Sequence, residues 1–552
     1  MAKTFELGLV MAGAVSAGAY TGGVIDYLIE ALDRWQAAKE GGDPDIPAHD
    51  VSIRALTGTS AGAMTCAIAG IVLNEDFAPV RDLPAPGAAT GNKLYDSWVR
   101  EIDIDLLLGL GDLDAKDATV ESLLNSAPLD AIAGKALALS PRAGRRAYVA
   151  DPLDVFLCVT NLRGVPYSLR FRGAAGVEHG MTAHADHMRF GVTWEAGTAL
   201  HNSALRLVPG AGEHWATFKE SALASGAFPV GLKPRLLHRA AGHYNRREWL
   251  VPRAAADGGG FELTEIAPDW NLDDAAGYDF LNVDGGVMNN EPLELARQAL
   301  AGAEGRNPRG AKEAHRAVVM IDPFPNPVLF DPDYEADPSL AAVVGRMFNS
   351  LIAQARFKPD ELALARDTQV YSRFVMAPSR HRNPADPAAG IEPHALACGG
   401  LGGFGGFLSE SFRRHDFQLG RRNGQRFLRE HFLLHEDNPV FGGWWTEAAS
   451  AEARATHGRQ QDGGWFFPIV PVLDEGEIAQ PDWPHIDSVR LERIRSAIHD
   501  RADRVVDRLL RRHLPGWFLR QGVWAGWAFK RKQVVSSIME TIAGDLAKRG
   551  LL

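Results

Sequence analysis

The chain has 552 residues, of which 46% are hydrophobic and 23% are charged, a composition that excludes a disordered chain and easily supplies a folded core. The formal net charge of −11 makes nucleic acid a poor partner, because surfaces that bind nucleic acid are usually basic. Three scattered cysteines, Cys66, Cys158 and Cys398, argue against a disulfide framework and against a zinc knuckle.

The sequence also predicts where the protein resides. The N-terminal segment MAKTFELGLVMAGAVSAG is typical of a first strand, since it lacks the basic segment and clean apolar core that mark a signal peptide. No run of about 18 uncharged apolar residues is present, so we expect no membrane-spanning helix. We therefore expect a cytoplasmic protein that makes, at most, peripheral contact with a membrane, and the few cysteines fit such a reducing compartment.

The first elements in chain order alternate between strand and helix. Residues 5–11 form an apolar run of strand length, the small-residue loop AGAVSAG follows, and a helix is predicted at 19–35. The apolar positions of this helix that share one face are Val24, Tyr27, Leu28, Ala31, Leu32 and Trp35. A second apolar strand is predicted at 51–59 and a helix of small and apolar residues at 61–73. Because the strands are almost continuously apolar, this order predicts an α/β fold with a central, mostly parallel sheet covered by helices on both faces.

Later in the chain the pattern is less regular. The elements predicted there are a mixed, largely helical stretch at 75–150, strands at 155–162, 166–173, 278–286 and 317–325, and a short helix at 220–229 that a proline ends. Residues 172–215 are polar and rich in histidine, which indicates an insertion or lid. Beyond about residue 330 helical stretches dominate, broken by the glycine-rich loop 398–407. We therefore predict an α/β domain at 1–330 with that insertion and a mainly helical C-terminal region at 331–552.

The sequence GTSAG at 58–62 places Ser60 between Gly58 and Gly62, after a strand and before a helix. A chain of this composition contains G-x-S-x-G roughly 0.3 times by chance, so the pattern alone is weak evidence. The flanking elements strengthen it, because a tight strand–turn–helix holds a serine hydroxyl clear of the backbone and the glycines avoid collisions there. Ser60 and Ala61 would begin the helix, where free N–H groups and the helix dipole favour a developing negative charge. The alternative is that Ser60 only caps the helix.

A serine nucleophile also needs hydrogen-bond donors for an oxyanion. The small-residue loop that begins with Gly13, Ala14 and Val15 can supply backbone N–H groups. In a parallel sheet, loops at the carboxyl ends of neighbouring strands meet at one edge, which brings this loop beside Ser60. The alternative is an ordinary strand-to-helix loop.

A serine nucleophile also needs a base. Three Asp-Gly-Gly sites offer a carboxylate, at Asp257, Asp284 and Asp462. Asp284 ends the apolar strand FLNV, whereas the other two lie in flexible or polar stretches typical of turns. Followed by Gly285 and Gly286, Asp284 is therefore the candidate that accepts the serine proton directly.

Three of these segments together resemble the patatin-like phospholipase family. LVMAGAVSAGAYTGGV resembles in length the family's glycine-rich oxyanion loop and following helix, GTSAGA its nucleophile turn, and VDGGVMNNEP its Asp-Gly-Gly segment with the Asn-Asn-x-Pro continuation. ASGAFPVGLKP at 224–234 is similar to the family's small-residue and proline segment. The resemblance covers roughly residues 5–325 and rests on three motifs in the family's order, each at a predicted strand end.

The resemblance implies a three-layer patatin-like catalytic domain and a Ser–Asp dyad that uses no histidine, metal or cofactor. Ser60 would attack an acyl ester carbonyl, Asp284 would act as base and then as proton donor to the leaving alcohol, and water would release the acyl-enzyme. The implied substrates are lipid acyl esters.

One departure from the family pattern concerns the first loop. The family usually has Gly-Gly-Gly followed by x-Arg or x-Lys, whereas this chain has Gly13, Ala14, Val15, Ser16 and Ala17. The backbone N–H groups survive these changes, but a β-branched Val15 tolerates a positive φ poorly. The missing basic residue removes a partner for a substrate phosphate. We therefore expect a lipid acyl hydrolase without assigning it a preference for phospholipids.

Two segments of the C-terminal region each have two explanations. Residues 409–428 carry five arginines among apolar residues, which favours a helix with internal ion pairs over a face that binds an anionic headgroup or an acidic partner. Residues 514–532 combine three tryptophans and two phenylalanines with Lys-Arg-Lys, a pattern typical both of peripheral membrane contact and of helix packing. The histidines of 179–190 lack helical metal-ligand spacing and favour a polar lid or surface loop.

Two other functional interpretations stay open at this point. An α/β-hydrolase esterase would use a Ser–Asp–His triad, and 18 histidines supply candidates, but that fold usually places several strands before the nucleophile turn. A catalytically degenerate patatin-like scaffold would bind lipid or a protein partner, and the altered 13–17 loop is its main support. Nucleotide binding by the first loop is disfavoured, since its spacing does not match G-x-G-x-x-G.

Overall fold

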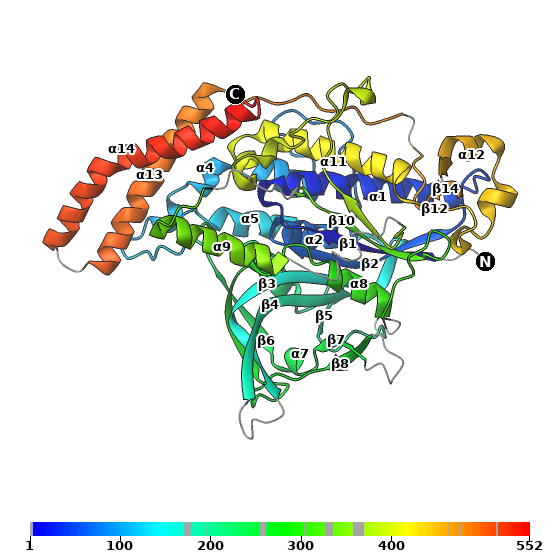
Figure 1. Ribbon diagram of the computed structural model, residues 1–552, viewed down its shortest axis with the longest axis horizontal. Coiled ribbons are helices and arrows are strands. Elements are labelled where there is room, and N and C mark those ends of the chain that lie inside the picture. Colours follow the sequence, from blue (N-terminus) through cyan, green and yellow to red (C-terminus); the bar gives the residue numbers. More distant parts are fainter. Residues whose placement is uncertain are drawn as a thin grey trace.

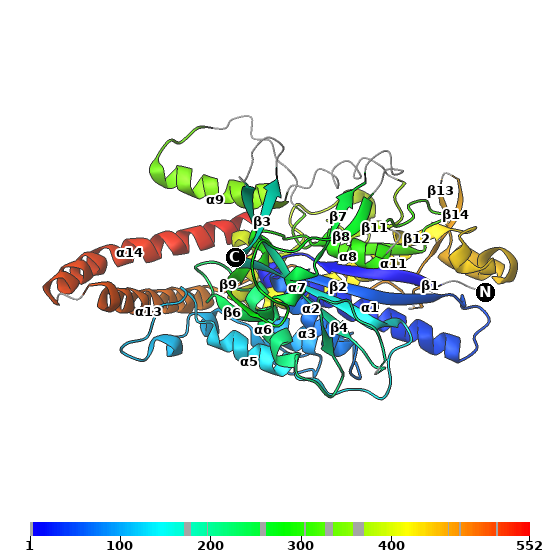
Figure 2. The same ribbon diagram turned by 90° about the horizontal axis from the view of Figure 1, so that it is seen from below.

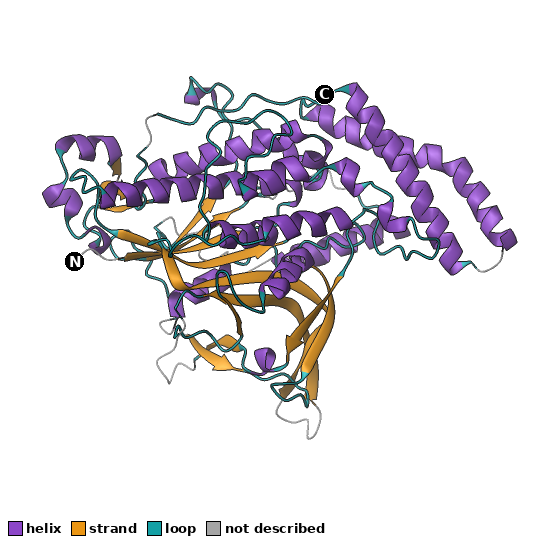
Figure 3. Cartoon of the chain, turned by 180° about the vertical axis from the view of Figure 1, so that it is seen from behind, coloured by secondary structure: helices purple, strands orange, loops and turns teal. Residues whose placement is uncertain are grey.

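The fold is that of a three-layer α/β protein. The computed structural model describes residues 4–170, 178–195, 197–253, 261–302, 305–325, 335–356, 369–461, 463–473, 476–514 and 517–552. A large, mostly parallel sheet lies between helices on both of its faces, and a helical C-terminal region follows (Figures 1 and 3). The fold class predicted from the sequence is therefore confirmed.

The elements have the following bounds. The strands are β1 (Thr4–Met11), β2 (Asp50–Thr59), β3 (Val149–Arg170), β4 (Glu178–Val192), β5 (Ala204–Leu207), β6 (Arg235–Ala240), β7 (Glu248–Pro252), β8 (Phe261–Glu265), β9 (Gly277–Asp284), β10 (Arg316–Ile321), β11 (Arg373–Met376), β12 (Leu433–His435), β13 (Arg459–Gln461) and β14 (Gly464–Pro468). The α-helices are α1 (Gly18–Glu40), α2 (Ala61–Val72), α3 (Lys93–Tyr95), α4 (Ile104–Leu107), α5 (Ala127–Ala136), α6 (Trp215–Ser225), α7 (Gly242–Asn245), α8 (Leu293–Ala301), α9 (Leu340–Arg356), α11 (Glu410–Glu430), α12 (Ala451–His457), α13 (Ser488–His513) and α14 (Trp517–Lys548). Three short helices of other types matter for the site: the 3₁₀-helices η1 (Val15–Ala17) and η5 (Gly285–Val287) and the π-helix η2 (Asp96–Glu101).

The central sheet has two halves with different strand directions. Its strands lie in the order β11–β10–β1–β2–β3–β4–β5, and β9 pairs outside this path with β3 and β6. From β11 to β3 every neighbouring pair is parallel. Both β4 and β9 run antiparallel to β3, which extends well beyond the end of β2. The first half matches the predicted parallel sheet, and the second half is an antiparallel addition to it.

The predicted insertion or lid at 172–215 instead contributes two strands, β4 and β5, to this sheet. Residues 178–192 form β4, which pairs with β3 from Leu153↔Val192 to Arg170↔Glu178. Near its end every second side chain is buried, among them Asp186, Met188 and Phe190. Because the alternate positions are exposed, the segment has the composition of a loop. The burial of every second side chain is nevertheless typical of a strand. Residues 171–177 and 196 lie outside the described part of the chain.

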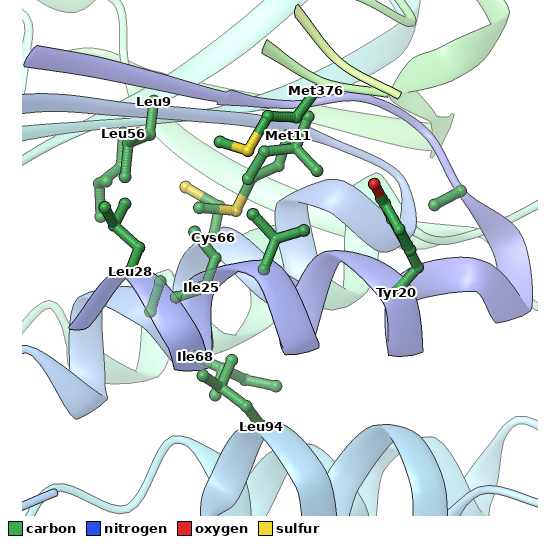
Figure 4. Close-up of a cluster of buried hydrophobic side chains, with 14 of the residues drawn as sticks. Leu9, Met11, Tyr20, Ile25, Leu28, Leu56, Cys66, Ile68, Leu94 and Met376 are labelled. Atoms are coloured by element: carbon green, nitrogen blue, oxygen red, sulfur yellow. The ribbon is translucent and has the colours of Figure 1, made fainter. Parts of the chain in front are cut away.

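The main core lies between the sheet and the α1–α2 layer. Leu9 and Met11 of β1 and Leu56 of β2 pack toward Ile25 and Leu28 of α1 (Figure 4). A smaller apolar cluster covers the opposite face and consists of Val10, Val318, Met320, Ala296 and Leu300, the last two from α8. Both faces of the parallel strands are therefore buried, which explains their continuous apolar runs.

A second long helix, α11, packs across α1 on the side away from the sheet (Figures 1 and 2). The two helices approach closely at two glycines: a Cβ added to Gly23 would collide with the carbonyl of Phe417, and one added to Gly420 with the carbonyl of Tyr20. Because α11 covers it, α1 is buried around its whole circumference over its first four turns, rather than on the single apolar face that the sequence predicts.

The arginines of α11 form ion pairs inside the protein, as the sequence favours. Arg421 is buried between Asp26 and Glu30 of α1, with its Nη2 2.6 Å from a Glu30 carboxylate oxygen. Arg413 is equally buried and reaches Asp103 at 3.3 Å. These side chains hold α11 on the α/β layers, so they are not available to an external anionic partner.

One hydrophobic core spans the predicted domain boundary at residue 330. The main cluster of buried residues includes positions from Phe5 to Leu551. Strand β11, which follows the boundary, extends the central sheet next to β10. The C-terminal region therefore folds onto the same sheet as the first 330 residues.

Helices α13 and α14 form a hairpin that projects from the body of the molecule (Figures 1 and 2). The predicted aromatic segment 514–532 lies mostly on α14; residues 515 and 516 are outside the described part. Trp527 donates a hydrogen bond to Asp503 of α13 at 2.7 Å, whereas Phe529 is 85% exposed. The described part of this segment therefore both packs against α13 and exposes an aromatic side chain. Within the described ranges, no helix combines the length and apolarity needed to cross a membrane.

The buried ion pairs predict a large effect on stability. Replacing Arg421 by Ala leaves Asp26 buried without its cation and removes one of the three arginines that pair with Glu30. We expect a loss of about 3–5 kcal/mol in the free energy of unfolding, measured by urea denaturation. The matched control is Arg495→Ala, which removes an exposed pair with Glu492 and should cost less than about 1 kcal/mol. Equal small losses in both variants would contradict the internal role of Arg421.

Candidate active site

Ser60 occupies a strained turn between β2 and α2. Its φ of 57° and ψ of −129° lie where a non-glycine residue is rarely found. The two flanking glycines have no room for a side chain, since a Cβ on Gly58 would collide with the backbone at Gly62, and one on Gly62 with the carbonyls of Met11 and Ala12. The glycines thus allow the nucleophile turn to pack directly against the end of β1, where the first loop starts.

The hydroxyl of Ser60 donates a hydrogen bond to the carboxylate of Asp284, with 2.6 Å between Oγ and Oδ2. Its side chain makes no hydrogen bond that caps α2, so the helix-cap alternative is not supported. The Ser60 backbone N–H donates a hydrogen bond of 2.8 Å to the hydroxyl of Ser225, which is buried at the end of α6. The two residues predicted as nucleophile and base are therefore in direct contact.

Asp284 reaches this position by a different route from the predicted one. The prediction relied on parallel strands that end at one edge, but β9 runs antiparallel to β3 and approaches the site from the opposite direction. On β3, Cys158 pairs with Thr59 of β2 and the next residue, Val159, pairs with Asp284. The end of β2 and the end of β9 therefore meet head-on at β3. Strand β9 is also not fully buried, since its side chains alternate between exposed and buried.

The motif after Asp284 fixes its backbone and its carboxylate. The Asp284 N–H donates to the carbonyl of Ala227 at 2.9 Å, and the Thr160 hydroxyl donates to the Asp284 carbonyl at 2.8 Å. A Cβ on Gly285 would collide with the Cys158 carbonyl, and the N–H of Gly286 donates to Asp284 Oδ1 at 2.7 Å. The Asp-Gly-Gly sequence thus presses β9 against β3 and supplies one hydrogen bond to the carboxylate.

The Asp284 carboxylate is unusually basic for an aspartate. Its residue is only 4% exposed, and burial raises its pKa from the ordinary 3.8 to about 6, although the hydrogen bonds from Ser60 and Gly286 favour the charged form. Among the described residues that line the surrounding pocket, none is a histidine and none is cationic. A buried carboxylate with such a pKa, bonded to a hydroxyl, can accept that proton near neutral pH.

Two backbone N–H groups near Ser60 are available to an oxyanion. Gly13 is not one of them, because its N–H donates to the carbonyl of Asn290 at 3.2 Å. Within the described part of the chain, no residue accepts a hydrogen bond from the N–H of Val15 or of Ala61, and both residues line the pocket that contains Ser60. Of the predicted donors, Val15 therefore fits best, together with the first residue of α2.

Val15 adopts the left-handed conformation that a β-branched residue disfavours, with φ at 48°. The glycine-rich loop 398–407 of the C-terminal region supports it: the next residue, Ser16, donates a hydrogen bond to the carbonyl of Gly403 and accepts one from the N–H of Gly406 at 3.0 Å. A missing glycine in the first loop is thus compensated by contacts with a segment almost 390 residues away in sequence.

The pocket around Ser60 and Asp284 is mainly apolar and has a cavity volume of about 50 Å³. The side chains that line it come from both halves of the chain and include Met64, Trp98, Ile102, Leu107, Leu124, Leu129, Phe228, Leu232, Phe404 and Phe407. Sequence reasoning missed Phe404 and Phe407, and also Ser225. Only the unusual glycine content of 398–407 indicated a tightly packed segment there.

The remaining site predictions have simple outcomes. Asp257 and Asp462 lie outside the described residues. The histidine-rich segment 179–190 is part of β4 rather than a lid or surface loop. No group of three or more His, Cys, Asp or Glu residues that could hold a metal ion occurs in the described ranges. The three cysteines are buried and none of them forms a disulfide.

Comparison with known proteins gives a family but no activity. No protein-family model matches the chain. The uncharacterized protein y4iI of Sinorhizobium fredii is 36% identical to it over an alignment 588 positions long, which covers 99% of this chain and 82% of that protein. The chain therefore belongs to the same family as y4iI.

The raised pKa of Asp284 predicts a stability cost that can be measured without a substrate. The folded protein binds the proton of the Asp284 carboxyl group more tightly than the unfolded chain does. Protonated Asp284 therefore stabilises the fold at low pH, and this stabilisation of roughly 2–3 kcal/mol is lost as pH rises from about 4 to about 6. We therefore expect Asp284→Asn to raise the free energy of unfolding at pH 8 by about 2 kcal/mol and to leave it nearly unchanged at pH 4. A destabilised Asp284→Asn protein at pH 8 would contradict the assigned environment.

Proposed function

We propose that the chain is a serine lipid acyl hydrolase of the patatin-like phospholipase type, acting through a Ser60–Asp284 dyad and an acyl-enzyme. The observation that carries the proposal is the 2.6 Å hydrogen bond between the serine hydroxyl and a buried aspartate whose pKa is about 6, inside an apolar pocket. The three sequence motifs that resemble the family meet at this point.

The first half of the reaction uses the groups already in contact. Asp284 accepts the Ser60 proton while Oγ attacks the carbonyl carbon of the ester. The negative charge that develops on the carbonyl oxygen is stabilised by the N–H groups of Val15 and Ala61 and by the start of α2. Collapse of the tetrahedral intermediate breaks the ester bond, and Asp284 returns its proton to the leaving alcohol.

The second half repeats these steps with water. Asp284 accepts a proton from the water molecule as the water attacks the acyl-enzyme carbonyl, and the same N–H groups stabilise the second tetrahedral intermediate. The proton then returns to Ser60 Oγ as the carboxylic acid leaves. The carboxylate alternates between base and acid, which its raised pKa permits.

Apolar surface near the pocket supports a lipid substrate. Phe228 lines the pocket and is 43% exposed, and it lies on the same segment as Val230, which is 71% exposed. Leu123, half exposed, donates its backbone N–H to the carbonyl of Val230 at 2.9 Å. This patch can contact a lipid surface while the pocket admits an ester. The exposed Phe529 and the adjacent Lys530 on α14 offer a second point of peripheral membrane contact.

The two alternatives predicted from the sequence receive less support. A Ser–Asp–His triad needs a histidine between serine and aspartate, whereas Ser60 and Asp284 bond to each other directly. A non-catalytic scaffold has no need for strained conformations at both Val15 and Ser60, and such outliers persist mainly where a site requires them.

A hydrolysis panel tests the proposal. We expect the wild type to cleave short-chain nitrophenyl esters, lysophospholipids, diacyl phospholipids or triacylglycerols, and Ser60→Ala and Asp284→Asn each to lower kcat by roughly a thousandfold or more. Ser52→Ala, on the strand β2 that leads to Ser60, is the matched control and should retain wild-type activity. Hydrolysis that survives in folded Ser60→Ala, or an inert wild type across the panel, would disprove the proposal.

A further inference from the structure

A second cavity adjoins the pocket that contains Ser60. The two share four lining side chains, those of Met64, Trp98, Ile102 and Leu129. The second cavity continues away from Ser60 between α2, η2, α5 and α6, and its volume is also about 50 Å³. It touches neither Ser60 nor Asp284, so it is an extension of the site rather than part of the reacting centre.

The walls of this second cavity expose only apolar atoms. Its far side is formed by small or branched residues, among them Ile68 of α2, Ala133 of α5 and Ala222 of α6. An apolar cavity of this kind does not hold ordered water, because water would find no polar partners there. It remains a favourable place for a hydrocarbon segment, which loses contact with water on entering.

A different, polar cavity lies beside the first loop and the glycine-rich loop 398–407. It is larger, about 580 Å³, and is lined by Gly13 and Gly403 together with the charged side chains of Glu392 and Arg549. An aliphatic chain would have to displace water from those charges. The two cavities therefore differ in polarity, and only the smaller one favours hydrocarbon.

We propose that the second cavity is an acyl-chain site, whose far wall at Ala133 and Ala222 sets the longest acyl group that binds fully. This inference rests on the proposed function and names its substrate class: esters of unbranched aliphatic acids. With the ester carbonyl at Ser60, the first methylenes occupy the Ser60 pocket. The following methylenes pass the four shared side chains and enter the second cavity.

This site has a quantitative consequence for substrate choice. Each methylene that becomes buried contributes roughly fourfold to binding. The value of kcat/KM should therefore rise with acyl length until the chain meets the far wall, and then level off or fall. The chain length at that break is set by the side chains of the wall, not by Ser60 or Asp284.

The test compares acyl-length profiles with nitrophenyl esters from two to sixteen carbons. We expect Ala133→Phe, which fills the cavity, to move the break to a shorter chain and to lower kcat/KM for the longer esters roughly tenfold or more, with the acetate ester changed less than twofold. Ile68→Ala, which enlarges the cavity, should move the break to a longer chain. Ala131→Phe, exposed on the same helix α5, is the matched control and should keep the wild-type profile.

A binding arm separates this inference from the proposed function. Titration of Ser60→Ala with 1-decanol needs no catalysis, and we expect binding that weakens at least tenfold when Ala133→Phe is added. If no ester is cleaved but decanol binding shows this loss, the proposed function fails and the hydrocarbon site stands. If esters are cleaved and neither Ala133→Phe nor Ile68→Ala shifts the break, the acyl-chain site is wrong. Absence of decanol binding to Ser60→Ala would also overturn it.

Discussion

The site depends on two strands that end at the same point of β3 from opposite directions. Strand β2 delivers Ser60 from the parallel half of the sheet, and β9 delivers Asp284 from the antiparallel half, so that hydroxyl and carboxylate meet at 2.6 Å. The head-on approach also buries the carboxylate, because β3 and α6 close around it. That burial raises the pKa of Asp284 to about 6 and destabilises the folded protein at neutral pH, a cost that a catalytic base commonly carries.

The C-terminal region completes this site rather than standing apart from it. Its glycine-rich loop 398–407 bonds to Ser16 and supplies aromatic side chains to the pocket. The loop is itself held from α14, since Asp545 accepts a hydrogen bond from the N–H of Leu401 at 3.0 Å. Helix α11 covers α1 through close glycine contacts and buried arginine pairs. The first loop therefore keeps a strained Val15 because the loop 398–407 bonds to the next residue, Ser16, and packs its aromatic side chains against Val15.

Local sequence patterns predicted the elements that carry the site, and non-local packing determined the rest. The strand–turn–helix around Ser60 could be predicted because it follows from local geometry, whereas Gly62 and Gly285 are required by close contacts with β1 and β3. The direction of β9 could not, because periodicity identifies a strand but not its partner. The strand at 178–192 was mistaken for a loop because only alternate side chains are buried. The pocket residues Phe404 and Phe407 could not be predicted, since they reach the site only through contacts between the loop 398–407 and the first loop, almost 390 residues away in sequence.

The most direct test of the central claim is covalent labelling with a fluorophosphonate, followed by intact-mass spectrometry and peptide mapping. The Ser60–Asp284 bond predicts a single adduct on Ser60, formed at a rate that falls about tenfold per pH unit below about pH 6, as the carboxylate takes up its proton. An unmodified Ser60 in the folded protein, an adduct on another serine instead, or labelling that is equally fast in Asp284→Asn would contradict the claim that these two residues form one reacting unit.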